Sequence, residues 1–439
     1  MANIAIVVLD TLRKDTFDEH FDWLPGRRYE QAYSTSNWTV PAHASLFTGR
    51  YASEVAVHAK DTYLDCERPS LAEQLSTAGY TTRAFSANTN ISGHFGFDRG
   101  FDQFFSPAAQ RHLNDDNLFD WRAFNRESSR TGVSRYLDAV RQCVADDCRT
   151  LPSLLAGLRM TLRDEENAYR GTAEATERFG EVSFGADEFL FANVMEVHEP
   201  YRAPKSYRTV EEPALTNSVG DLSFGTVDGA QTRTAYEDCA RYLSDAYRDF
   251  FDLLTDDFDY VVTLSDHGEL LGEHDGWGHE HGLYPELTRI PLVVSGDGLD
   301  GTCTAPVSLL DVHRTILELA GVDGGNSHGQ SLLGDVDDRE YLTEYHGLTP
   351  WSERKLKENG YEDELATYDA NRRGCLTAAG YGYETPDEVV TIGDLSADDA
   401  RELIRTLADG LVVEETVGDG DDNDVPEEVQ SRLEDLGYA

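Results

Sequence analysis

Continuous apolar runs alternate along the chain with segments in which apolar residues recur every three or four positions. The apolar runs are typical of strands covered on both faces, and they fall at 4–9, 81–87, 189–197, 260–264 and 289–294. The periodic segments predict amphipathic helices at 42–48, 70–78, 232–254 and 307–320. Because strands that alternate with helices build parallel sheets, the pattern predicts an α/β fold whose mainly parallel sheet carries helices on both faces.

The C-terminal part of the chain has a different pattern. Here strands are predicted at 340–344 and 374–383, and helices at 397–409 and 425–436, with an acidic, glycine-containing linker between the helices. We therefore predict an α/β domain at 1–335 and a smaller α+β subdomain with an acidic tail at 336–439. Residues 107–185 are polar and charged, and we predict that they form an insertion in the first domain, as a lid or a substrate wall.

Negative charge is spread along the whole chain. The sequence has 82 Asp and Glu residues against 37 Lys and Arg residues, which gives a net charge of −45. Only five of the cations are lysines, at positions 14, 60, 205, 355 and 357. Such dispersed acidity indicates a solvated surface like that of proteins from salt-loving organisms, for example halophilic archaea. It argues against nucleic-acid binding, which needs a basic surface.

The apolar segments are too short for a membrane-spanning protein. None approaches the ~20 consecutive apolar residues of a transmembrane helix. The first residues have neither a basic leader nor a small-residue cleavage site, so we predict a cytoplasmic location. The six cysteines form no CxxC pair, and in that compartment free thiols are expected instead of disulfides.

Polar side chains directly follow three of the predicted strands. Asp10 follows the first strand, His198 follows the strand at 189–197, and Asp266 and His267 follow the strand at 260–264. Ligands bind at the carboxyl ends of strands in open α/β sheets, and a carboxylate beside an imidazole is a pair that divalent metals use. Taken singly, Asp10 also fits a helix cap, and His198 also fits a hydrogen-bonded structural histidine.

Thr39 lies two residues before Pro41, just upstream of the helix predicted at 42–48. Proline is favoured in a first helical turn, where free N–H groups and the positive end of the helix dipole gather. Such a position binds anions and favours an ionised hydroxyl, so Thr39 is a candidate nucleophile. A plain cap on a surface helix fits the local pattern as well.

His281 belongs to a histidine cluster that follows the strand at 260–264, and its ring is a candidate functional group. A mobile polar loop is the alternative interpretation of this cluster.

Six segments occur in an order that resembles the sulfatase family of the alkaline phosphatase superfamily. They are IAIVVLDTLRKD, TVPAHASLFTG, EVHEPY, LSDHGELLGEH, HGLYPELTRIPLVV and VSLLDVHRTILELAGV. The resemblance covers most of the chain. The resemblance implies an alkaline-phosphatase-like fold. It also implies one divalent metal ion (calcium, manganese, magnesium or zinc) held by Asp10, Asp266 and His267, with a position open for the Thr39 oxygen.

The resemblance also assigns roles to three histidines. His198 and His281 are expected to bind the anionic group or to protonate the leaving oxygen. His43 stands where typical sulfatases carry an arginine that steadies the nucleophile. The implied substrate is a small-molecule, glycan-linked or lipid-linked sulfate or phosphate ester.

The chain departs from the family pattern at three positions. Thr11 follows Asp10 where the family often has a second aspartate, and the usual lysine is not evident, although Asn88 lies in its neighbourhood. Sulfatases convert a cysteine or serine into formylglycine, which Thr39 cannot become. A threonine ester cannot expel sulfate by collapsing to an aldehyde, so water must attack sulfur or phosphorus directly. The Thr-x-Pro-x-His pattern ending at His43 resembles phosphodiesterases of the superfamily that use threonine, but a full second set of metal ligands cannot be placed.

These observations support a metal-dependent hydrolase of the sulfatase family that cleaves sulfate or phosphate esters through Thr39. The nucleophile chemistry favours phosphate esters. A phosphodiesterase or a phospho-group transferase of the same superfamily is the first alternative. The second is a catalytically weakened protein that binds only metal or anion, which the missing aspartate and lysine favour and the joint presence of the metal ligands and Thr39 opposes.

Overall fold

The computed structural model describes residues 2–107, 119, 140–144, 148–150, 153–154, 171–213, 228–325 and 327–412. The acidic linker, the helix predicted at 425–436 and most of the insertion predicted at 107–185 lie outside these residues. Among the described helices, none combines the length and the apolar character needed to cross a membrane. All six cysteines are free thiols, as predicted.

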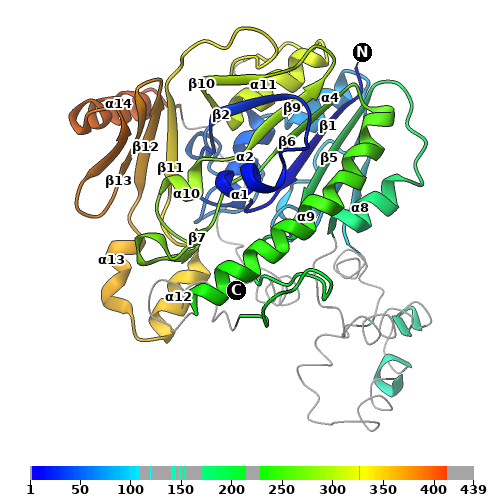
Figure 1. Cartoon of the computed structure of the whole chain (residues 1–439), viewed down its shortest axis with the longest axis horizontal. Helices are drawn as coiled ribbons and strands as arrows, with labels where there is room; N and C mark the ends of the chain where they lie inside the picture. The colour runs from blue at the N-terminus through cyan, green and yellow to red at the C-terminus, as the bar shows by residue number, and fades with distance from the viewer. Residues whose placement is uncertain are drawn as a thin grey trace.

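An eight-stranded sheet forms the centre of the molecule (Figure 1). Its order is β10-β2-β9-β6-β1-β5-β3-β4. The strands are β1 (Ile4–Leu9), β2 (Arg27–Tyr33), β3 (Thr81–Ser86), β4 (Gln103–Phe105), β5 (Glu188–Val194), β6 (Tyr260–Leu264), β9 (Leu292–Gly296) and β10 (Thr302–Ser308). Strand β9 runs antiparallel to both of its neighbours, and all other neighbouring pairs are parallel. The predicted mainly parallel sheet is thus confirmed.

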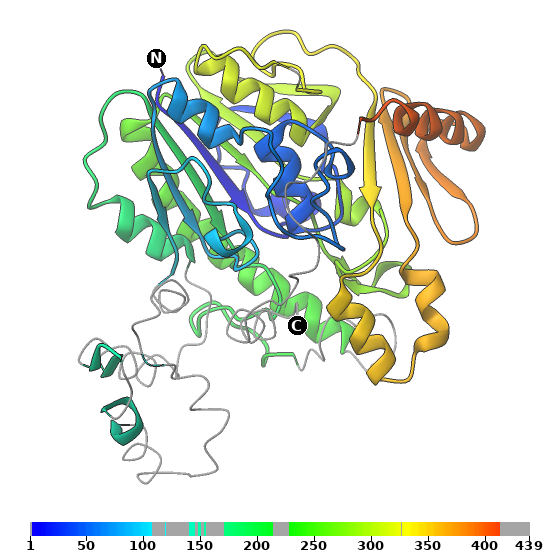
Figure 2. The same ribbon diagram turned by 180° about the vertical axis from the view of Figure 1, so that it is seen from behind.

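Helices cover both faces of this sheet. Figures 1 and 2 show α1 (Lys14–His20), α8 (Gly171–Phe179) and α9 (Gly229–Asp257) on one face, and α2 (Thr39–Thr48), α4 (Leu71–Thr77) and α11 (Leu309–Leu319) on the other. The short elements are α3 (Ala52–Val55), α10 (Pro285–Thr288), β7 (Leu270–Leu271) and β8 (Trp277–Gly278). Every residue of β1 is buried, because this strand is covered from both sides, as its unbroken apolar run predicts.

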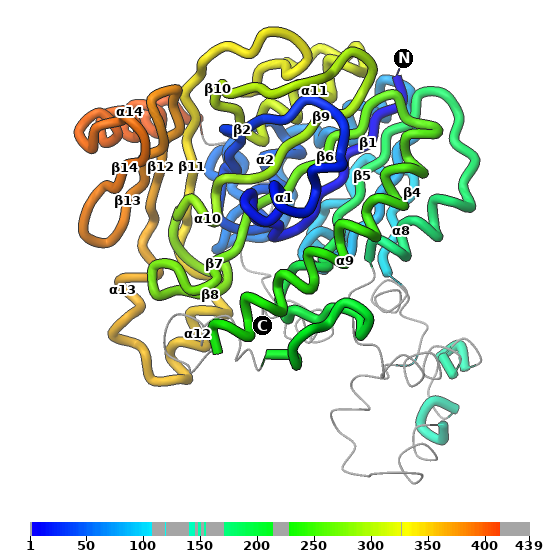
Figure 3. The backbone as a smooth tube through the Cα atoms, viewed as in Figure 1, coloured from blue at the N-terminus to red at the C-terminus, as the bar shows by residue number. Residues whose placement is uncertain are grey.

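Strand β1 lies between β5 and β6 at the middle of the sheet, as the chain path in Figure 3 shows. Val8 is paired with Asn193 on one side and with Leu264 on the other. This register places the residues that follow β1 and β6 level with the end of β5. The carboxyl ends of the three parallel strands therefore meet at one edge of the sheet.

A second, four-stranded antiparallel sheet follows in the chain, in the order β11-β12-β13-β14. Its strands are β11 (Tyr341–Tyr345), β12 (Arg372–Thr377), β13 (Gly380–Glu384) and β14 (Val389–Gly393), with helices α12 (Pro350–Glu358), α13 (Leu365–Tyr368) and α14 (Ala397–Asp409). The smaller α+β unit is confirmed, whereas its boundary at residue 336 stays a prediction. A β-bridge between Ser36 and Glu344 joins this sheet to the segment that precedes α2.

Two predicted elements need correction, and two strands of the central sheet that border one another were not predicted. The strand predicted at 374–383 is two strands, β12 and β13, because Gly380 turns the chain with a φ of 144°. Strands β2 and β10 were not predicted, because polar residues in both strands and Pro306 in β10 interrupt the apolar run that marks a buried strand. Helix α11 accordingly begins at Leu309, after β10, and not at Val307.

Candidate active site

The carboxyl ends of β1, β5 and β6 bring four polar residues together. Asp10 follows β1, Asn193 is the second-last residue of β5, and Asp266 and His267 lie just beyond β6. All four are buried, with exposed fractions of 1% or less. These residues are far apart in the sequence, and the register of the sheet makes them neighbours.

Asp10 uses only one of its two carboxylate oxygens in hydrogen bonds. Oδ2 accepts from Asn88 Nδ2 at 2.9 Å and from Asn193 Nδ2 at 3.2 Å. Oδ1 is buried and has no hydrogen-bond partner among the described residues. The two amides thus fix the carboxylate and direct its unused oxygen into the site.

Asp266 has the same arrangement. Its Oδ1 accepts from the backbone N–H groups of Thr11 at 3.3 Å and of His267 at 3.0 Å. Its Oδ2 is buried and has no hydrogen-bond partner among the described residues. Thr11 reaches this position with a φ of 60°, and its hydroxyl bonds to the carbonyl of Asp10, so the side chain does not replace the missing second aspartate as a ligand.

His267 completes the group with one ring nitrogen. Its Nδ1 lies 2.9 Å from the carbonyl oxygen of Gly268; because a carbonyl can only accept, Nδ1 carries the proton and Nε2 presents a lone pair. Nε2 is 3.8 Å from Asp10 Oδ1 and 3.5 Å from Asp266 Oδ2. Two unpaired carboxylate oxygens and one imidazole nitrogen, all within 4.8 Å of one another, fit a divalent metal ion.

The electrostatics of the three residues agree with this fit. Burial, followed by repulsion from Asp266, raises the pKa of Asp10 to about 8, and burial raises the pKa of Asp266 to about 7. Burial, followed by the neighbouring His279, lowers the pKa of His267 to about 4, so its imidazole is neutral at pH 7. Two carboxylates packed together away from water need a positive charge to stay ionised, which a bound cation supplies.

Thr39 lies beside these ligand atoms. Its Oγ1 is 3.2 Å from His267 Nε2 and accepts a long bond of 3.4 Å from Asn88 Nδ2. Helix α2 begins at Thr39 itself and not after Pro41, which corrects the predicted start. Pro41 is tolerated as the third residue, because N–H groups in the first turn have no helical partner. The candidate nucleophile thus belongs to the N-terminal turn of a fully buried helix.

His43 supports Thr39 from the next turn of α2. Its Nδ1 donates to the carbonyl of Thr39 at 2.8 Å, and its Nε2 accepts from Asn193 Nδ2 at 3.1 Å. Burial lowers the pKa of His43 to about 3. Because the ring is neutral, its 3.5 Å approach to Asp266 Oδ2 is not an ion pair. His43 therefore connects the first turn of α2 to the amide that orients Asp10.

Two further histidines extend the site away from Thr39. The rings of His279 and His267 have centroids 4.6 Å apart, and those of His198 and His279 are 5.0 Å apart. Nδ1 of His198 donates to the carbonyl of Glu199 at 2.7 Å. Nδ1 of His279 lies 2.9 Å from Oε1 of the buried Glu269. His198 is therefore connected to the centre through His279.

His281 occupies a different environment. Its ring packs against Tyr368 of α13 and against Tyr284, with centroid distances of 4.8 and 6.0 Å. Only 8% of the residue is exposed, and its Nδ1 has no hydrogen-bond partner among the described residues. The structure thus joins Asp10, Thr39, His43, Asp266 and His267 directly, while the roles of His198 and His281 stay predictions.

Sequence reasoning missed three residues of the site, namely Asn193, Glu269 and His279. Asn193 is the one polar residue in the apolar run FLFANV, a signal that was available in the pattern. His279 belonged to the histidine cluster but had no assigned role. Asn88, which was placed only in the neighbourhood of the missing lysine, lies in the site between Asp10 and Thr39.

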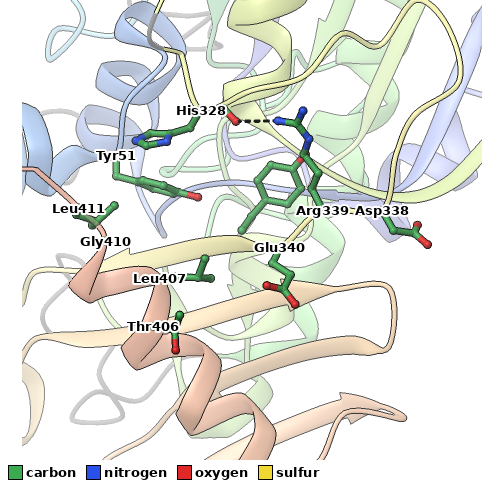
Figure 4. Close-up of a pocket in the computed structure, with 10 residues that line it drawn as sticks. Tyr51, His328, Asp338, Arg339, Glu340, Thr406, Leu407, Gly410 and Leu411 are labelled. Carbon is green, nitrogen blue, oxygen red and sulfur yellow. Dashed lines mark hydrogen bonds between the residues drawn. The ribbon is translucent and has the colours of Figure 1, made fainter.

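A hollow of about 520 Å³ lies elsewhere, between α14 and the start of β11 (Figure 4). Its walls include Tyr51, His328, Arg339 and Leu407. None of the residues that surround Thr39 lines it. This hollow is therefore separate from the candidate active site.

The chain is similar to proteins of known family. The family model described as Sulfatase matches residues 20–322. The uncharacterized sulfatase YidJ of Escherichia coli is 22% identical over 343 residues, which cover 73% of this chain and 66% of that protein. The low-salt glycan biosynthesis sulfotransferase Agl7 of Haloferax volcanii is 28% identical over 222 residues, which cover 40% of this chain and 52% of that protein. The chain thus spans about two thirds of the length of the first relative and about half of the second.

A solved structure shares the fold. The phosphonate monoester hydrolase SpPMH from Silicibacter pomeroyi superposes with a TM-score of 0.64 at 18% identity, covering 93% of this chain and 95% of that chain. The alkaline-phosphatase-like fold is thereby confirmed, and at the level of the family so is the expectation of a sulfatase-like ester hydrolase. Since the family model spans most of the α/β body, from residue 20 to residue 322, the chain belongs to the Sulfatase family.

Proposed function

We propose that the protein is a metal-dependent ester hydrolase in which Thr39 attacks a sulfuric or phosphoric ester. One observation carries this proposal: Thr39 Oγ1 lies 3.2 Å from His267 Nε2, next to unpaired oxygens of Asp10 and Asp266. A hydroxyl beside a set of metal ligands is how a weak alcohol nucleophile is activated. A threonine that only capped α2 would not need these neighbours.

The donor set of two carboxylate oxygens and one imidazole nitrogen accepts calcium, magnesium, manganese or zinc. When bound by Asp10, Asp266 and His267, such an ion would lower the pKa of the nearby hydroxyl and offset the negative charge of the group being transferred. The residues around the ligands position the carboxylate and the nucleophile. Asn88 and Asn193 orient Asp10, and His43 fixes the first turn of α2 that carries Thr39.

The reaction proceeds in two displacements. Thr39 Oγ1 gives up its proton to solvent and bonds to sulfur or phosphorus while the bond to the leaving oxygen breaks. His198 and His281 are neutral in the free protein, so either one must first take up a proton, when the anionic substrate binds, before it can protonate the leaving oxygen. Water then attacks the same sulfur or phosphorus, one of its protons returns to Thr39 Oγ1, and the free threonine is restored. Because a threonine ester has no aldehyde to collapse to, release depends wholly on this attack. This requirement favours phosphoric esters over sulfuric esters as substrates.

The test compares 4-nitrophenyl sulfate, 4-nitrophenyl phosphate and bis(4-nitrophenyl) phosphate in molar salt, each with calcium, manganese and zinc. Turnover should be lost in Thr39→Ala. The matched control is Thr48→Ala, because Thr48 is a buried threonine of the same helix whose hydroxyl donates to the carbonyl of Ala44 at 2.7 Å and accepts from the backbone N–H of Arg50 at 3.3 Å, both away from the ligand atoms. A protein that binds metal but shows no Thr39-dependent turnover would be the metal- or anion-binding alternative.

Group transfer to a second alcohol is the other candidate function. The Thr39 ester can pass its sulfuryl or phosphoryl group to any hydroxyl that displaces water, and one relative is named a glycan biosynthesis sulfotransferase. Both this relative, from Haloferax volcanii, and the net charge of −45 also support a protein adapted to high salt. Adding a soluble glycan during turnover distinguishes the two functions, because a transferase forms a modified glycan and a hydrolase forms only the free anion.

A further inference from the structure

One arginine of the C-terminal subdomain is buried without an acidic partner. Arg372, the first residue of β12, is only 6% exposed. Its guanidinium donates to the backbone carbonyl of Thr367, and no Asp or Glu among the described residues forms an ion pair with it. A guanidinium keeps its charge and has five N–H donors. Because a buried charge is unfavourable unless an opposite charge pairs with it, Arg372 lacks the partner that such a group needs.

The acidic side chains of this region bind elsewhere. Glu280 and Asp369 act on the same tyrosine ring as Arg372. Asp369 pairs with Lys60, and Glu280 accepts a hydrogen bond of 2.7 Å from the hydroxyl of Ser352. Neither carboxylate pairs with Arg372, so the charge of the guanidinium is left for a ligand.

His281 belongs to the same cluster of side chains as Arg372. Its ring packs edge-on against that of Tyr368 at 4.8 Å, and Arg372 bonds to the carbonyl of the residue before Tyr368. Figure 3 shows α13, which carries Tyr368, next to the hairpin of β7 and β8 that precedes His281. His281 Nδ1 is buried and has no hydrogen-bond partner among the described residues. Burial, followed by the charge of Arg372, lowers the pKa of His281 to about 4, so the ring is neutral at pH 7.

This cluster lies beside the candidate metal ligands. His281 comes two residues after His279, so the Cα atoms of the two histidines are at most about 7 Å apart. The ring of His279 has its centroid 4.6 Å from that of His267, and its backbone carbonyl accepts a bond of 2.8 Å from Asn37, two residues before Thr39. A molecule bound at Thr39 can therefore extend to the cluster.

We propose that Arg372 and His281 form a second anion-binding subsite, which holds a carboxylate, sulfate or phosphate of the substrate that is separate from the ester cleaved at Thr39. This inference rests on the proposed function and narrows its substrate class to esters whose alcohol part carries a further oxyanion. A guanidinium binds two oxygens of such a group through parallel hydrogen bonds, and the neutral His281 ring adds one N–H donor. Because buried charges are screened less than exposed ones, the contact persists in molar salt.

The test uses pairs of inhibitors that differ only in a second anionic group. Alkyl phosphates are compared with ω-carboxyalkyl and ω-sulfooxyalkyl phosphates of the same chain length, as competitors of the nitrophenyl ester that the wild-type protein cleaves fastest. At one or more chain lengths, the second anion should lower the inhibition constant at least about tenfold, the effect of a hydrogen bond to a charged group. The larger gain, from carboxylate or from sulfate, identifies the second group. Equal inhibition within every pair would overturn the inference.

Substitutions in β12 test the role of the guanidinium. Arg372→Met removes the charge and should abolish the difference within each pair, whereas Arg372→Lys keeps the charge without the planar fork and should retain part of it. Arg373→Met is the matched control, because this neighbouring arginine is exposed and alternate residues of a strand point to opposite faces; its difference should equal that of the wild-type protein. The ratio is measured within each variant, so a partial loss of folded protein cancels. An unchanged ratio in Arg372→Met would contradict the role of Arg372.

A binding measurement does not depend on turnover. Calorimetry with metal-loaded Thr39→Ala should show the ω-carboxyalkyl phosphate binding at least about tenfold more tightly than the alkyl phosphate, and adding Arg372→Met should remove the difference. If this difference is found but no ester is cleaved in a Thr39-dependent way, the proposed function is rejected and the subsite is kept. Thr39-dependent cleavage without any difference in binding rejects only the subsite, so the two failures are distinct.

Discussion

Thr39 Oγ1 and His267 Nε2 lie 3.2 Å apart, although 228 positions separate the two residues in the chain. Thr39 is the first residue of α2, and His267 follows β6 in the central sheet. The pair therefore joins a helix N-terminus to the carboxyl edge of the sheet. This junction places the Thr39 hydroxyl against the ring nitrogen of a candidate metal ligand.

The two aspartates of the candidate metal site have the same arrangement of hydrogen bonds. In each carboxylate, one oxygen accepts two hydrogen bonds and the other accepts none among the described residues. The unpaired oxygens, Asp10 Oδ1 and Asp266 Oδ2, both face His267 Nε2. Such second-layer bonds hold ligands in place before the ion binds, and they set which oxygen is available.

The metal-free protein should lose stability as pH rises from about 4 to about 8. Burial raises the pKa of Asp10 to about 8 and of Asp266 to about 7, so the folded state holds protons that the unfolded state releases near pH 4. A raised carboxyl pKa therefore destabilises the fold once the pH exceeds the unfolded value. Urea unfolding in the presence of a chelator should show the free energy of unfolding fall over this pH range. In Asp10→Asn the fall should be smaller by on the order of 2–5 kcal/mol.

Saturating divalent metal should reverse this trend in the wild-type protein, because the ion binds the ionised carboxylates and affinity rises with pH. Metal at about 100 times its Kd should add about 2.7 kcal/mol of stability. Asp10→Asn should show little of this gain, since its amide places a donor where the unpaired oxygen was. A metal-free protein whose stability is flat between about pH 5 and about pH 8 would contradict the burial of two unpaired carboxylates.

Sequence patterns could predict the site residues that end strands, because a buried apolar run ends abruptly at Asp10 and again at Asp266. They could not predict β2 and β10, whose pairing depends on neighbours distant in the chain. Nor could they predict Asn193 as a partner of Asp10, since that contact comes from the register between β1 and β5. Local pattern identifies the ends of elements, and tertiary register decides which ends meet.

Glu269 should act as a positioning residue for His279. Its Oε1 lies 2.9 Å from His279 Nδ1, and both groups are buried. Glu269→Leu removes the partner that orients the ring, so kcat should fall by about 10–100-fold with little change in KM. Glu269→Gln can still accept from Nδ1 and should recover most of the activity. Full kcat in Glu269→Leu would show that His279 needs no orientation, and unfolding midpoints of both variants distinguish a loss of fold from a loss of position.

Gly268 should be required for the position of His267. A Cβ added there would lie 2.0 Å from the carbonyl oxygen of Glu286, a backbone atom that cannot yield easily. The carbonyl of Gly268 also receives the His267 Nδ1 proton, and its N–H donates to Leu287 at 2.7 Å. Gly268→Ala should therefore move the loop, cost about 1–3 kcal/mol of unfolding free energy and weaken metal binding measured by calorimetry.

Gly334→Ala is the matched control for that loop, because a Cβ at Gly334 meets no atom within 4 Å and the residue does not adopt a left-handed conformation. We expect its unfolding midpoint and its metal affinity to equal those of the wild-type protein. A loss of metal affinity in Gly268→Ala that exceeds its loss of stability would show that the methyl group acts through His267. Wild-type metal affinity in Gly268→Ala would mean that the ligand set tolerates a displaced loop, and that the bond from Nδ1 to the Gly268 carbonyl does not fix the ring.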